Sequence, residues 1–63
     1  LEVRRLALGS VERIDAGAGE RVLVHAFAGS VGALSQHGTM ILEGESAELR
    51  AESAAIVLIG RAR

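Results

Sequence analysis

Residues 46–52 alternate between polar and apolar side chains without an exception. The apolar members are Ala47, Leu49 and Ala51, and serine, glutamate and arginine side chains lie between them. Successive side chains of a β-strand point to opposite faces, so this pattern is typical of a strand with one buried face. The segment is also rich in residues that favour helices, and a helix is the competing interpretation. We favour the strand, because a helix would place Leu49 and Glu52 on nearly the same side and leave no apolar stripe.

Residues 22–28 form the second informative segment. As a strand, they would carry valine and alanine at positions 22, 24, 26 and 28 on one face, with Leu23, His25 and Phe27 on the other. Apolar side chains on both faces predict a central strand that is covered twice.

Five more segments have the length and composition of short strands, and glycine-containing or polar turns separate most of them. They are residues 2–8, 11–14, 31–34, 39–42 and 54–59. The chain is therefore predicted to be all-β. We expect a single domain over residues 1–63, built as a small barrel or partial barrel of about six or seven short antiparallel strands.

The size of the chain predicts that it associates with another surface. A domain of 63 residues buries only about 60% of the surface that its unfolded chain exposes. It has no cysteine, which excludes disulfides and thiolate zinc sites as sources of stability. Residues 54–59 are uniformly apolar and too many for so small a core, so we expect a homo-oligomer, most simply a dimer, or a neighbouring domain. Lysine at Val57 or Ile59 should then dissociate or unfold the protein.

Charge and composition argue against two other partners. The net charge is −1, and seven arginines are scattered among eight acids, which is not the basic footprint of a nucleic-acid binder. Phe27 is the only aromatic residue, so stacking platforms for bases are missing.

No apolar run approaches the roughly 20 residues that span a bilayer. With no signal peptide visible, we expect a cytoplasmic protein. Arginine without lysine, beside many alanines and glycines, suggests a bacterial source.

The residues offer little catalytic chemistry. His25, His37 and Glu43 are the only candidates for a metal ligand set, but a metal site needs at least three protein ligands and no His-x-His spacing occurs. No Gly-x-Ser-x-Gly nucleophile motif is present. We therefore predict no catalytic residue, no metal and no cofactor for this chain.

The order of two motifs resembles the cupin superfamily. Residues 24–31, Val-His-Ala-Phe-Ala-Gly-Ser-Val, are similar to a cupin strand pair, and residues 40–46, Met-Ile-Leu-Glu-Gly-Glu-Ser, look like the turn before the return strands. The alternating strand and the final run at residues 55–59 look most like the C-terminal halves of pirin-like and HutD-type bicupins. The resemblance implies a jelly-roll fold and a structural or oligomerisation half that binds no metal, as the C-terminal part of a longer protein if the chain is not complete.

The resemblance leaves two alternatives open. His25-Ala-Phe27 lacks the second histidine of the cupin metal motif, and no histidine follows residue 37. The chain could then belong to a metal-dependent cupin enzyme, dioxygenase-like or isomerase-like, whose site lies mostly on another segment. It could also be a small-ligand-binding module that uses a barrel mouth lined by Leu23, His25 and Phe27.

Overall fold

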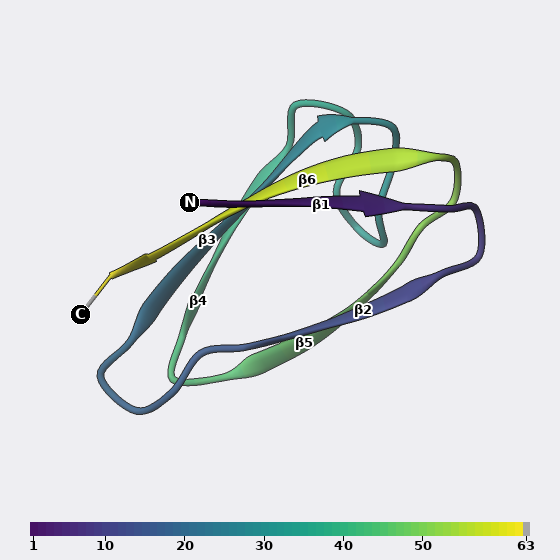
Figure 1. Cartoon of the computed structure of the whole chain (residues 1–63). Coiled ribbons are helices and arrows are strands. Elements are labelled where there is room, and N and C mark those ends of the chain that lie inside the picture. The colour runs from purple at the N-terminus through teal and green to yellow at the C-terminus, as the bar shows by residue number, and fades with distance from the viewer. Residues whose placement is uncertain (63) are drawn as a thin grey trace.

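The computed structural model describes residues 1–62, and within that range it contains six β-strands and no helix (Figure 1). The strands are β1 (Glu2–Leu6), β2 (Val11–Asp15), β3 (Arg21–Ala28), β4 (Thr39–Glu43), β5 (Ser46–Arg50) and β6 (Ala55–Ala62). Every pairing between them is antiparallel. The all-β prediction is confirmed for these residues. The helix considered at residues 46–55 is wrong, because β5 occupies the first half of that segment.

The strands pair as nested hairpins. β1 pairs with β6, β2 with β5 and β3 with β4, so the chain is one long two-stranded ribbon folded on itself. A further pairing of β3 with β6 joins the two ends of the ribbon. The result is a large sheet with the order β1-β6-β3-β4 and a small sheet of β2 and β5. Figure 1 shows the small sheet beneath the large one. The two sheets do not close into the barrel that the sequence suggested.

Residues 31–34, for which a strand is predicted, form a tight turn instead. Gly32 has a left-handed φ of 57°, which lets the chain reverse within this segment. The N–H of Val31 then donates to the carbonyl oxygen of Leu34 at 2.8 Å, and the N–H of Leu34 donates back at 2.9 Å. Val31 also forms an isolated bridge with Ala51. Val31 and Leu34 therefore pair with each other across the turn, and no extended strand forms here.

The core lies between the two sheets and is entirely aliphatic. Each strand contributes its inward-pointing residues, as the alternation in the sequence predicts. The buried members are Leu6, Ile14, Ala16, Val22, Val24, Ala26, Val31, Leu34, Leu42, Leu49, Ala51, Ala55, Val57 and Ile59. Burial of one such valine, leucine or isoleucine side chain is worth about 1.5–3 kcal/mol.

The final apolar run, residues 54–59, falls mostly within β6, which is not an edge strand. β6 lies between β1 and β3 in the large sheet. Ala55, Val57 and Ile59 point into the core, whereas Ile56 and Leu58 point away from it and are half-buried. Val57 and Ile59 are therefore core positions, and substitutions there report on folding rather than on association.

The prediction that β3 is covered on both faces is wrong for this chain. Val22, Val24 and Ala26 are fully buried against the small sheet. The opposite face of β3 points outward, where nothing in residues 1–62 packs over it: Leu23 and Phe27 are exposed. β3 is central in its own sheet, but the second layer exists on one side only.

Candidate functional site

The outward surface of the large sheet is unusually apolar, and we call it the open face. The register places its side chains in rows across the four strands. Its central side chains are Val3, Leu23, His25, Phe27, Thr39, Ile41, Ile56 and Leu58, and the register places Arg5, Arg21 and Glu43 at its margins. Val3 is 58% exposed, Phe27 54% and Ile41 53%. Antiparallel sheets with one solvated face normally alternate apolar-in and polar-out, and the open face departs from that rule.

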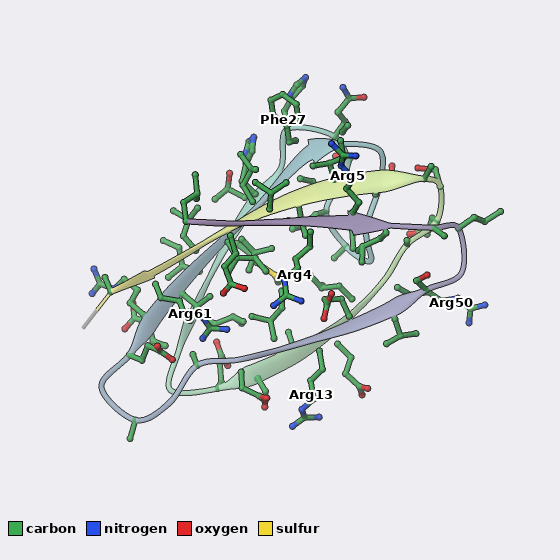
Figure 2. The ribbon with its side chains drawn as sticks, viewed as in Figure 1. Arg4, Arg5, Arg13, Phe27, Arg50 and Arg61 are labelled. Atoms are coloured by element: carbon green, nitrogen blue, oxygen red, sulfur yellow. The ribbon has the colours of Figure 1, made fainter. Side chains whose placement is uncertain are left out.

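The small sheet provides the contrast within the same molecule. Its outward side chains are mostly polar or charged: Val11, Arg13 and Asp15 from β2, and Ser46, Glu48 and Arg50 from β5. Figure 2 shows Arg13 pointing away from the core on this side, while Phe27 points away on the opposite side. The two outer surfaces therefore differ in chemistry although both are sheet faces.

Leu23, His25 and Phe27, the residues predicted to bind a ligand, lie together on the open face. They come from alternate positions of β3, so the strand geometry brings them to one side. They do not line an interior mouth between the sheets, because the interior side of β3 is filled by valines and Ala26. Their role in ligand binding stays a prediction, and a ligand bound there would lie on an open surface rather than in a barrel mouth.

The structure brings His25 and His37 close together. Their ring centroids are 6.4 Å apart with the planes tilted by 32°. His37 lies in the turn before β4 with a positive φ of 72°, and its N–H donates to the carbonyl oxygen of Ala26 at 2.7 Å. Nδ1 of His25 is 2.8 Å from Oγ1 of Thr39, its cross-strand neighbour, and this contact leaves Nε2 as the nitrogen without a partner in the described part of the chain.

Glu43 does not join this pair. It lies four residues along β4 from Thr39, which is about 13 Å at the usual rise of a strand. Its carboxylate instead pairs with Arg21 at 3.4 Å. Across residues 1–62, no three histidine or acidic side chains converge in a way that could hold a metal ion. Of the three metal candidates from the sequence, His25 and His37 are neighbours and Glu43 is distant from both.

A network of ion pairs between the sheets was not anticipated from the sequence. Arg4 contacts Glu2 at 2.7 Å and Glu12 at 3.9 Å. Arg61 contacts Glu2 at 3.4 Å and Glu20 at 3.3 Å, and it donates to the carbonyl oxygen of Asp15 at 2.8 Å. Figure 2 shows Arg4 and Arg61 directed toward the space between the sheets. The network connects β1 and β6 of the large sheet to β2 and the loop that follows it.

These contacts shift two titrations. The hydrogen bond from Arg4, with a second from Arg61, lowers the pKa of Glu2 below its ordinary value. The hydrogen bond to Glu2 raises the pKa of Arg4. All members of the network are partly exposed, and each of its three acids has an arginine nitrogen within 4 Å. The network links the two sheets through ion pairs. Its acids are engaged with arginines, so we assign it a structural role.

The sequence did contain a signal for this network. Glu2 and Arg4 share the parity of the buried Leu6 in β1, so a strand there must direct two charges inward. Inward charges at the end of a strand require partners from the facing sheet. Which acids supply them depends on the pairing of distant strands, and no local pattern encodes that.

The hollow at the other end of β4 carries mixed charge. It has a volume of about 400 Å³ and is lined by Gly19, Glu20, Arg21, Glu43, Gly44 and Ala62. Two of its charged members, Arg21 and Glu43, already pair with each other across it. The open face, rather than this hollow, is the surface whose composition calls for an explanation.

No protein-family model, curated protein or solved structure matches this chain. Within residues 1–62 there is also no helix of the length and apolarity required to cross a lipid bilayer.

Proposed function

We propose that this chain is a cupin-like structural domain that contributes to assembly rather than catalysis, and that it binds no metal. In this proposal it is the structural or oligomerisation half of a pirin-like or HutD-type bicupin. Its partner is a second copy or a neighbouring cupin domain.

The nested pairing of the strands is the observation that carries the proposal. A jelly roll has eight strands in total, and it arises when a long antiparallel ribbon is wrapped into two facing sheets. Here β1·β6, β2·β5 and β3·β4 form such a ribbon, and the β3·β6 pairing is its wrap. Six strands follow this scheme if one hairpin of the eight-stranded form is reduced to a turn. In this proposal, residues 31–34 correspond to that hairpin, and their bridge to Ala51 just beyond β5 supports the correspondence.

The absence of metal is tested by loading the protein. The purified chain is incubated with Zn²⁺, Fe²⁺, Mn²⁺ or Ni²⁺, desalted and analysed for bound metal. We expect far less than one metal per chain, and no difference between the wild type and a His25→Ala/His37→Ala double variant. Stoichiometric metal that the double variant loses would overturn the proposal and favour a metal-dependent enzyme.

Ligand binding is the second candidate function, and the composition of the open face favours it. Leu23 and Phe27 supply apolar contact area, while His25 and His37 supply polar groups beside them. A site of this kind, apolar with a few polar groups, is typical of small-molecule recognition, although such sites are usually concave. A thermal-shift screen against small metabolites separates the two candidates. A stabilisation that His25→Ala abolishes supports ligand binding, whereas no stabilisation supports a structural role.

A further inference from the structure

The open face is large enough to form the contact of a small dimer. Four strands spaced about 4.8 Å apart, two of five residues and two of eight, cover roughly 400 Å². Two copies that stack on this face would bury about 800 Å², which is the size of a weak, transient interface. Apolar patches of more than a few hundred Å² are rare on soluble monomers. The face is therefore of the right size and chemistry to be covered by another protein surface.

Charges at the corners of the open face indicate which surface covers it. Arg5 lies on the β1 edge, in the row of Ile56 and Ala28. Glu43 lies on the β4 edge, at the diagonally opposite corner, where its carboxylate pairs with Arg21 at 3.4 Å while its side chain stays 66% exposed. Figure 2 shows Arg5 pointing to the same side of the large sheet as Phe27. No acid in residues 1–62 forms an ion pair with Arg5.

Arg5 at one corner, unpaired within residues 1–62, and the exposed Glu43 carboxylate at the other make the face complementary to itself. Glu43 is available for this contact because one carboxylate can contact two arginines, as Glu2 does with Arg4 and Arg61. A two-fold axis in the plane of the contact, perpendicular to the diagonal, places Arg5 of one copy against Glu43 of the second copy. The same operation forms the reciprocal pair at the other corner. The apolar rows between the corners then meet apolar rows, because an isologous contact uses one surface twice.

We propose that the open face is the contact surface of a two-fold homodimer of this chain, with Leu23 and Phe27 in the apolar centre and the Arg5–Glu43 pairs at two corners. The inference rests on the proposed structural function and specifies its surface and its partner. Sheet faces pack about 10 Å apart with interdigitated side chains, so the dimer adds a layer over the uncovered side of β3.

The dimer is tested by sedimentation velocity over a range of concentrations, with two matched lysine variants. Val3 and Val11 are both valines on edge strands, 58% and 57% exposed, but Val3 belongs to the open face and Val11 to the small sheet. We expect the wild type to dimerise at or below about 100 μM and Val11→Lys to match it within about twofold. Val3→Lys and the central variant Leu23→Lys should weaken dimerisation at least about 30-fold. Circular dichroism confirms that each variant is folded.

A charge-reversal cycle tests the two-fold arrangement. Arg5→Glu and Glu43→Arg should each weaken the dimer, because each places like charges together at both corners. The double variant Arg5→Glu/Glu43→Arg restores opposite charges between the copies, although each chain loses its own Arg21–Glu43 pair, and it should bind more tightly than either single variant. A double variant that binds no more tightly than the single variants would overturn the arrangement.

The outcomes separate this inference from the function on which it rests. A wild type that stays monomeric at 100 μM overturns the homodimer, whether the face is then bare or covered by a different partner. A dimer that survives Leu23→Lys and Val3→Lys places the contact elsewhere, for example at a free strand edge. In that case the open-face dimer is wrong, while a metal-free assembly domain still stands.

Discussion

Gly29 is the position at which the fold most strictly excludes any side chain. Its φ of 75° lies in the left-handed region that favours glycine. A Cβ atom at this position would press against the carbonyl oxygen of Ala54 and lie 2.8 Å from Oγ of Ser53. The end of β3 therefore approaches the start of β6 so closely that only a hydrogen atom fits between them.

We predict that Gly29→Ala lowers the free energy of unfolding by about 2–4 kcal/mol. The control is Gly19→Ala, because Gly19 has a φ of 76° but no atom within 4 Å of an added Cβ. It should cost only the backbone strain, about 1–2 kcal/mol. Urea unfolding of both variants measures the difference. Equal losses would show that the close approach to Ala54 is not what excludes a side chain.

Glu2 makes stability depend on pH. Its pKa is lowered in the folded protein, so the folded state binds a proton less readily than the unfolded chain does. The stabilisation is complete above the ordinary pKa near 4.5 and is lost as pH falls through the lowered value. We expect Glu2→Gln to flatten the decline of the melting temperature between pH 5 and pH 2, measured by thermal unfolding.

The matched control for Glu2 is Glu48→Gln on the outer surface of the small sheet. Glu48 takes no part in any ion pair formed within residues 1–62. Its loss should leave the acid decline as steep as in the wild type. If the two variants behave alike, the network around Arg4 and Arg61 is too well screened by solvent to influence folding.

At the scale of the element, neighbouring residues of β6 have different roles: one face of the strand contributes to folding and the other to association. Val57 is fully buried between the sheets, while Leu58 points to the open face. A domain of this length is stable by only about 3–9 kcal/mol, and a lysine charge forced into an aliphatic core costs several kcal/mol. We predict that Val57→Lys is unfolded by circular dichroism and that Leu58→Lys stays folded, because its side chain can reach water.

The reverse result would contradict the register. If Leu58→Lys unfolds the chain and Val57→Lys does not, β6 is shifted by one residue relative to β3, which exchanges the two faces of the strand. If both variants are unfolded, both faces of β6 are buried in the monomer. The first outcome contradicts Ala26 opposite Val57 in the ladder, and the second contradicts the exposure of Leu23 and Phe27 on the outward face.

At the scale of the whole molecule, stability and association are coupled. The two sheets bury one aliphatic layer, and the molecule is only about 17 Å across its two shorter axes. A dimer on the open face stabilises the folded state by mass action, so the melting temperature should rise with protein concentration. Leu23→Lys should abolish that rise. A melting temperature independent of concentration in the wild type would contradict the coupling.

Much of the fold could be predicted from local patterns. The alternation through Leu49 identified β5, and the valines at 22 and 24 identified β3, because the pleat assigns alternate residues to opposite faces whatever the rest of the chain does. The turns at Gly29 and Gly44 were equally local. The strand predicted at residues 31–34 was wrong, because a short apolar segment can form either a strand or a tight turn. The left-handed backbone of Gly32, which the structure shows, produces the turn.

The candidate site was predictable in part. Leu23, His25 and Phe27 share a face by strand geometry alone, so their grouping required no structure. Their neighbours did require it: His37, Thr39 and Ile41 reach them through the register of β3 with β4. That the face lies open also depends on the layering of the sheets.

The sequence by itself determined that the chain is built of strands and which residues of each strand share a face, since both follow from the period of two in an extended backbone. Only the tertiary structure decided which strands pair, which face becomes the core and which remains uncovered. The reason is that pairing joins residues as distant as Glu2 and Ile59. The small sheet, with only two strands, can cover one side of the large sheet and not both.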